Sequence, residues 1–168
     1  DNTMDLRDLK KEMPYKWRVQ SFSKKKPQAT CVAYVDSRQV QERLDDVCGP
    51  DKWQCKYYEV KGNVYCAIGI KVNDEWVWKS DCGTESNQDA QKGEASDAFK
   101  RAAVKWGVGR FLYDLKMKTV KANAVKANNT YPYPVDDQGR QIWDLTKHFN
   151  NTVNKPTTKV AYEVPVKV

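Results

Sequence analysis

The fold is decided by residues 92–115, which read KGEASDAFKRAAVKWGVGRFLYDL. Apolar side chains recur there with the i, i+3, i+4 and i+7 spacing that places them on one face of an α-helix. They are Ala95, Ala98, Phe99, Ala102, Ala103 and Trp106. Gly107 and Gly109 follow, and glycine tolerates the left-handed backbone conformation that commonly ends a helix. The segment therefore predicts an amphipathic helix that covers an apolar surface and stops before Gly107.

Two adjacent cations, Lys100 and Arg101, lie off the apolar face of this predicted helix. At about 100° per residue, their side chains point to opposite shoulders of the polar face. They can therefore contact an anionic ligand while Phe99 and Trp106 stay in a core. The alternative interpretation is a packing helix whose cations are simply solvated, and this segment alone does not separate the two.

The preceding residues predict an antiparallel sheet with one helix inserted into the strand order. Alternating apolar and polar residues indicate strands, and the turns Gly62-Asn63 and Asn73-Asp74 join neighbouring strands as hairpins. Asp36 or Ser37 can cap a helix at residues 38–47. The predicted strands are residues 15–23, 29–35, 53–60, 64–72 and 75–82. The order β-β-α-β-β-β-α defines an α+β domain, in which the long amphipathic helix covers an antiparallel β-meander.

The pattern weakens after Leu115, so we expect a core domain at residues 1–115 and a partly irregular, basic extension at residues 116–168. Within the extension, residues 116–126 could form a strand and residues 142–149 a short helical turn. The last residues are polar and contain two prolines, which is typical of an extended tail. Residues 160–168 could instead pair with a sheet edge of a neighbouring subunit.

Charge is unevenly distributed along the 168 residues, whose formal net charge is +7. Residues 1–115 carry 20 Lys and Arg against 18 Asp and Glu, and residues 116–168 carry 9 against 4. A polyanion site in the nearly balanced core must therefore be a local groove, to which the extension adds diffuse attraction. Six Trp and nine Tyr suit stacking on nucleic-acid bases, although aromatic residues are more often core residues.

Cysteine spacing argues against a metal site or a disulfide framework. The five cysteines form no Cys-x-x-Cys pair, and His148 is the only histidine. We therefore expect reduced thiols, no metal or other cofactor, and a location inside the cell, in the cytoplasm. No apolar run reaches the roughly 18 residues that span a bilayer, and no signal peptide is recognised, so no membrane partner is expected.

One enzymatic alternative stays open. Pro50-Asp51 followed by Glu59-Val60-Lys61 has the form of a nuclease signature, in which Asp51 and Glu59 would hold Mg²⁺ and Lys61 would orient the attacking water. The same residues are also explained by a helix-ending turn and an ion pair at a strand end. A serine or cysteine triad is hard to build around a single histidine, and no phosphate-binding glycine loop is present.

A non-enzymatic interpretation accounts for more residues together. Single strands are held by a basic groove that follows the phosphates, usually beside aromatic or apolar surfaces that support the bases. Arg38 at a helix start, Lys100 and Arg101 are the phosphate ligands that the pattern favours, and arginine adds bidentate binding. The exposed turn Lys24-Lys25-Lys26 could also touch phosphate. A module that binds structured RNA would suit the same surface.

Four motifs in this order resemble the Rad52 family of single-strand annealing proteins, and its phage and bacterial Sak-type branch in particular. The resemblance covers residues 15–115 and includes the meander. The motifs are Val35-Asp-Ser-Arg-Gln-Val40, Asp81-Cys-Gly83, the helix at residues 92–103, and Trp106-Gly-Val-Gly109.

This resemblance implies a β-β-β-α core that assembles side by side into a ring-shaped homo-oligomer. The family holds single-stranded DNA in a groove around the ring, so that a complementary strand can anneal without ATP. Its DNA-contacting residues fall on Arg38, Lys100 and Arg101, whereas a further basic position falls on Val104, beside Lys105. The aromatic residue that the family places between glycines before the long helix is absent. No segment resembles the eukaryotic recombinase-binding region, so no recombinase partner is expected.

Overall fold

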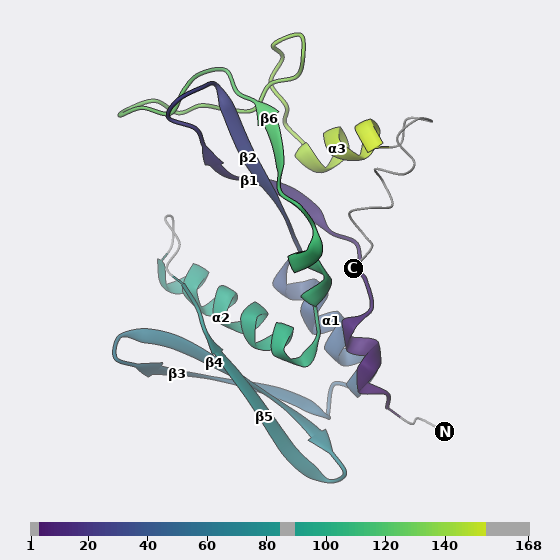
Figure 1. Cartoon of the computed structure of the whole chain (residues 1–168). Coiled ribbons are helices and arrows are strands. Elements are labelled where there is room, and N and C mark those ends of the chain that lie inside the picture. The colour runs from purple at the N-terminus through teal and green to yellow at the C-terminus, as the bar shows by residue number, and fades with distance from the viewer. Residues whose placement is uncertain (1–3, 85–89, 154–168) are drawn as a thin grey trace. The chain divides into compact units, whose positions relative to one another are not determined.

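The computed structural model of the chain describes residues 4–84 and 90–153, and these residues form two structural units (Figure 1). Of the described residues, the first unit contains 4–13, 35–84 and 90–111, and the second contains 14–34 and 112–153. Both are built on three-stranded antiparallel sheets, which confirms the α+β class. Among the described residues, no helix is long and apolar enough to cross a membrane.

The β-meander forms the sheet of the first unit. Strands β3 (Trp53–Val60), β4 (Asn63–Val72) and β5 (Glu75–Cys82) pair in sequence order, as expected. The first hairpin loop is Lys61-Gly62, one residue earlier than predicted, and the second is Asn73-Asp74. All four loop residues have positive φ angles, between 52° and 81°. Such two-residue loops match the twist of the paired strands and fix their register.

Helix α2 (Ala90–Trp106) lies along one face of this sheet (Figure 1). Ala98, Phe99, Ala102 and Ala103 are all buried, as the apolar spacing predicts. The indole Nε1 of Trp106 donates a hydrogen bond to the carbonyl oxygen of Ile68, 3.0 Å away, and Ile68 is fully buried. The helix stops at Trp106, and Gly107 follows with φ 109°.

A close approach between β5 and α2 explains Gly83. A Cβ atom at this position would lie 2.1 Å from the carbonyl oxygen of Glu94 and 2.9 Å from the amide nitrogen of Ala98. Both are backbone atoms of α2, so no side-chain rotation can make room. Gly83 also continues the ladder, because its N–H donates to the carbonyl oxygen of Val64.

Helix α1 (Ser37–Cys48) begins with a capping box, in which Asp36 accepts from the N–H of Gln39 and Gln39 accepts from the N–H of Asp36. Its Arg43 side chain donates to four backbone carbonyls at and after the short helix η1 (Leu6–Lys10). The guanidinium of Arg43 therefore holds the N-terminal segment on α1 through neutral backbone carbonyls.

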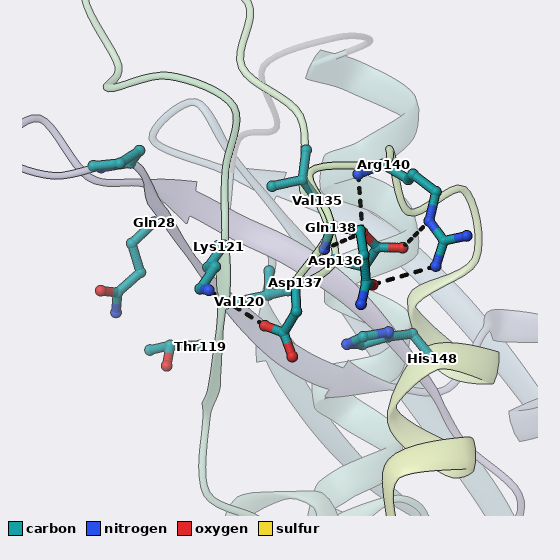
Figure 2. Close-up of a pocket in the computed structure, with 11 residues that line it drawn as sticks. Gln28, Thr119, Val120, Lys121, Val135, Asp136, Asp137, Gln138, Arg140 and His148 are labelled. Carbon is teal, nitrogen blue, oxygen red and sulfur yellow. Dashed lines mark hydrogen bonds and ion pairs between the residues drawn. The ribbon is translucent and has the colours of Figure 1, made fainter.

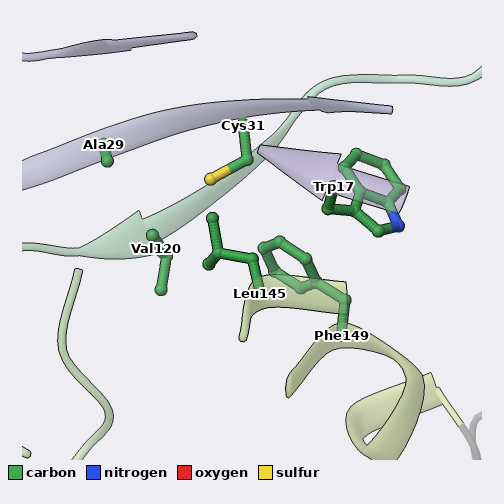
Figure 3. Packing of buried hydrophobic residues seen from close by; sticks show 6 residues of the cluster. All are labelled: Trp17, Ala29, Cys31, Val120, Leu145 and Phe149. Atoms are coloured by element: carbon green, nitrogen blue, oxygen red, sulfur yellow. The ribbon is translucent and has the colours of Figure 1, made fainter. Parts of the chain in front are cut away.

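The second unit combines the first hairpin with the C-terminal part of the chain. Strands β1 (Lys16–Phe22), β2 (Gln28–Tyr34) and β6 (Lys118–Lys121) form its sheet, and helix α3 (Leu145–Val153) packs on β1. Figure 3 shows the core that they share. The core residues are Trp17, Ala29, Cys31, Val120, Leu145 and Phe149.

This arrangement differs from the expected division after Leu115. Because β6 pairs with β2, the strand expected within residues 116–126 completes the sheet of the first hairpin. The helical turn expected at residues 142–149 is α3, whose Phe149 meets Trp17 edge to face at 5.2 Å. The segment proposed to pair with a neighbour, residues 160–168, lies outside the described residues.

Two thiols meet on neighbouring strands of the meander. Cys66 lies opposite Tyr57, and Cys55 is two residues before Tyr57 on the same strand face. A hydrogen bond from Cys66 stabilises the Cys55 thiolate and lowers the pKa of Cys55 to about 7. The same contact, with burial, raises the pKa of Cys66. Burial raises the pKa of Cys31 and of Cys48 to about 11. Cys55 is therefore the reactive member of the pair.

Replacing Gly83 with alanine tests the close approach of β5 to α2. Gly83→Ala should destabilise the protein by about 2–3 kcal/mol, because its Cβ overlaps helix backbone. The control is Gly62→Ala, where no atom lies within 4 Å and only the positive φ costs about 1 kcal/mol. Urea denaturation followed by circular dichroism measures both variants. Equal destabilisation of the two would contradict the close approach.

Iodoacetamide alkylation tests the Cys55–Cys66 contact. At pH 7.5 we expect Cys55 to react before Cys31, Cys48 and Cys66, because it is half-buried and substantially a thiolate at that pH. Cys66→Ala removes the hydrogen-bond donor, so alkylation of Cys55 should then need a higher pH. Peptide mass spectrometry over a pH series reports the order of reaction. The contact is disproved if Cys55 reacts with the same pH profile in both proteins.

Candidate nucleic-acid interface

The start of α1 is held against the middle of α2, and this contact brings the segment that carries Arg38 beside the part of α2 that carries Lys100. The hydroxyls of Ser37 and Ser96 share a hydrogen bond of 2.8 Å. One turn further along α2, the ammonium of Lys100 donates to the carbonyl oxygen of Val35 at 3.4 Å. Arg38, the second residue of α1, is exposed next to this contact. The docking of the two helices therefore places Arg38 near Lys100, whereas Arg101 lies on the β5 side of α2.

Lys100 and Arg101 turn to opposite sides of α2, as the helical geometry predicts. Lys100 is half-buried on the α1 side, where its ammonium donates to the carbonyl oxygen of Val35. Arg101 lies on the β5 side, with its Nε 3.8 Å from a carboxylate oxygen of Asp81 and its side chain 43% exposed. Arg101 is thus partly turned toward an acidic partner. At that distance and exposure the ion pair is weak, and the guanidinium keeps solvent-facing donors.

The predicted cation Lys105 belongs to a different cluster, at the C-terminal end of α2. Its ammonium donates to the carbonyl of Ser80, and Lys79 donates in turn to the carbonyl of Lys105. Arg110 donates to the carbonyls of Val104 and Lys105. The bonds from Lys79 and Arg110 satisfy carbonyls at the negative end of the helix dipole, so this cluster stabilises the end of α2. Sequence reasoning did not single out Lys79 or Arg110, although cations near a helix C-terminus are a recognisable signal.

The carboxylates around the α1–α2 contact have structural partners. Asp36 caps α1, and Asp97 accepts from the N–H and the hydroxyl of Thr84. Glu94 accepts from the N–H of Val64 at the start of β4. These bonds hold the acidic groups toward the fold. Charge at this surface is nevertheless close to balanced, so an anionic ligand must meet the cations at short range.

The basic turn Lys24-Lys25-Lys26 belongs to the second unit, between β1 and β2. All three side chains are exposed, and the N–H groups of Lys25 and Lys26 donate to the hydroxyl of Ser23. The turn is therefore a compact cationic tip of the second unit.

Sequence reasoning missed a cavity of about 510 Å³ in the second unit (Figure 2). Lys121 pairs there with Asp137 at 3.3 Å, and Arg140 pairs with Asp136 at 2.9 Å. Hydrogen bonds from the backbone of Arg140 and Gln138, together with the Arg140 side chain, lower the pKa of Asp136. His148 of α3 points toward this cluster (Figure 2). Because each of these two cations has a carboxylate partner, the cavity has little net attraction for a polyanion.

The nuclease pattern does not assemble. Asp51 precedes β3 and pairs with Lys52 at 3.2 Å, whereas Glu59 lies at the far end of β3. The six residue steps along β3 from Trp53 to Glu59 alone span about 20 Å, so the two carboxylates lie far apart. Lys61 lies in the hairpin loop, outside the strand, so it does not share a strand face with Glu59. Within the described ranges, no three His, Cys, Asp or Glu side chains are placed to hold one metal ion.

Comparison with known proteins gives concordant results. The family model described as "Rad52/22 family double-strand break repair protein" matches residues 5–131. A protein of Deinococcus radiodurans named single-stranded DNA-binding protein DdrA is 37% identical over 121 residues, covering 67% of this chain and 58% of that protein. The protein of the same name from Deinococcus deserti is 34% identical over 126 residues, covering 74% and 62%. The matched regions thus span about three fifths of these relatives. No solved structure matches significantly.

The matched region contains both helices of the α1–α2 contact, all five strands of the predicted order, and β6. On this match over most of its length, the chain belongs to the Rad52/22 family of double-strand break repair proteins.

Proposed function

We propose that this protein binds single-stranded DNA and anneals complementary strands during homologous recombination and DNA repair. The observation that carries the proposal is the docking of α1 on α2, which positions Arg38, Lys100 and Arg101 on one unit. The family to which the chain belongs supports it, and so do the names of its two bacterial relatives, which describe them as single-stranded DNA-binding proteins. Such a role places the protein inside the cell, with DNA as its partner.

The mechanism requires no catalytic residue and no nucleotide. Cations on rigid helices neutralise phosphates of a bound strand and release its counterions. Repulsion toward a second strand then falls, while the exposed base edges sample pairing. Duplex formation supplies the driving force. Arg38 and Arg101 are suited to bidentate phosphate contacts, and Lys100, oriented by the carbonyl of Val35, acts as a point charge.

The proposal includes a ring of side-by-side copies with the annealing core of the family. One chain presents only a short cationic surface, and a closed ring would join such surfaces into a continuous track for one strand. The lysine turn at residues 24–26 and Lys105 are further proposed contacts with DNA. In the second unit, the side chains of Lys24, Lys25 and Lys26 are exposed, and the hydroxyl of Ser23 holds the backbone of the turn.

Substitution of the α2 cations tests the proposed site. Lys100→Ala and Arg101→Ala should each weaken binding to single-stranded oligonucleotides of any sequence. Each should also reduce the slope of log affinity against log salt by about 0.7, as loss of one phosphate contact predicts. Lys52→Ala is the matched control, because Lys52 is an exposed cation of the same unit outside the proposed site. Fluorescence anisotropy over a salt series measures all three variants.

Unchanged affinity and salt slope in both Lys100→Ala and Arg101→Ala would show that the α2 cations do not contact DNA. Competition with RNA and duplex DNA in the same assay measures the preferred nucleic acid. A preference for structured RNA would replace the annealing proposal with an RNA-binding function.

Light scattering tests the ring. The purified full chain should elute as a single species with many times the mass of one 168-residue chain, because side-by-side contacts close on themselves. A monodisperse monomer across the concentration range would contradict assembly into a ring.

A further inference from the structure

The meander has a second face, which points away from α2. Trp53 and Ile68 belong to the face that α2 covers, where the Trp53 ring lies 6.2 Å from that of Phe99. Successive residues of a strand point to opposite sides, so the alternate residues of β3, β4 and β5 form the other surface. We call this surface the outer face. It is defined by Lys56, Tyr58, Tyr65, Lys71, Trp76 and Trp78.

Aromatic rings cover much of the outer face in two groups. Tyr58 lies directly opposite Tyr65, and their rings are stacked at 5.4 Å with 13° between the planes. Four residues further along β4, the ring of Trp78 covers Gly69, where a Cβ would lie 2.9 Å from it. The groups are about 13 Å apart along the strand.

The rings of Tyr65 and Trp78 are therefore packed against their neighbours, whereas the rings of Tyr58 and Trp76 are more exposed to solvent. Trp76 lies 6.3 Å from Trp78 and is 38% exposed, and Tyr58 is 43% exposed. Scattered exposed apolar residues need no explanation, but aromatic rings gathered on one sheet face mark an interaction surface. Flat rings of this kind offer stacking surfaces to unpaired bases.

The positive charge of the outer face favours an anionic partner. Its two ionised side chains among the strand residues are Lys56 and Lys71, and the ammonium of Lys56 lies 4.5 Å from the centre of the Trp78 ring. The carboxylates of the three strands belong to the opposite face by the same alternation. They are Glu59, Glu75 and Asp81. Cations beside exposed rings fit a polyanion with accessible bases.

We propose that the outer face is a second contact surface for single-stranded DNA, in which Trp76 and Tyr58 stack on bases and Lys56 contacts phosphate. The inference rests on the proposed function and adds base stacking to the phosphate contacts of α2. A two-fold contact with a second copy fits less well, because it would bring the same lysines against each other, and a head-to-tail contact between copies in a ring is an outcome of the test below. Duplex DNA fits less well, because its bases are already stacked and paired.

An abasic strand separates stacking from phosphate binding. Anisotropy titrations with the full chain should compare oligothymidylate with an abasic deoxyribose-phosphate strand of equal length. Trp76→Ala and Tyr58→Ala should each weaken binding to oligothymidylate about tenfold, as expected for the loss of one stacked base, and leave abasic binding unchanged. Trp76→Phe should retain most of the affinity. Trp143→Ala, which removes an indole that is 86% exposed in the second unit, is the matched control.

Three results would overturn the inference. Unchanged affinity for oligothymidylate in both alanine variants would show that the rings do not stack on bases. An equal loss on the abasic strand would assign them another role, and a reduced oligomer mass would make the outer face a contact between copies. Circular dichroism verifies that each variant is folded. Lys56→Gln tests the outer face with a substitution that removes no aromatic ring. If the unaltered protein fails to bind oligothymidylate, the proposed function itself fails. If only Lys100→Ala and Arg101→Ala weaken binding, this inference alone fails.

Discussion

The close packing of α2 against the meander is the constraint on which the first unit depends. Three buried alanines and Gly83 let the helix backbone approach β5, and no larger residue at position 83 fits without moving that backbone. The apolar face of α2 is thereby fixed, and its remaining side chains must point toward α1, toward β5 or into solvent. The placement of Lys100 and Arg101 is therefore a consequence of core packing, since the cations themselves contribute little to stability at such exposure.

The sequence was sufficient to predict the local elements and one long-range contact, the packing of the apolar face of α2 on the meander. Period-2 alternation and short loops predicted β3, β4 and β5, and β3 and β5 have the predicted bounds, because both signals are local. The first hairpin loop is Lys61-Gly62, whereas the sequence predicted Gly62-Asn63. Lys61 occupies the first loop position with a positive φ of 52°. The pairing of β6 with β2 was not predictable in the same way. It joins residues about 90 positions apart, and a four-residue strand has almost no periodicity.

The candidate site was predicted in part for similar reasons. Helical periodicity predicted that Lys100 and Arg101 leave the apolar face, but their partners, Val35 and Asp81, come from distant segments. Lys105 fits the basic pattern equally well, yet it contacts the carbonyl of Ser80, because Lys79 and Ser80 of β5 lie beside the C-terminal end of α2. The nuclease pattern was not confirmed because residues that are eight positions apart along an extended strand, such as Asp51 and Glu59, lie far apart in space. A metal site needs its carboxylates within a few ångströms of each other. The outer face could not be predicted, because its aromatic residues are of the kinds that also form a buried core.

The first unit therefore combines two surfaces of different chemistry on a single sheet-and-helix layer, one with cations at a helix junction and one with aromatic rings beside lysines. The most direct measurement of the central claim is annealing of two complementary labelled strands by the purified chain, in EDTA and without nucleotide. The account predicts that duplex forms faster than in the absence of protein and that the acceleration fades as salt rises. Annealing at the spontaneous rate, with both strands at concentrations where the protein binds them, would contradict it.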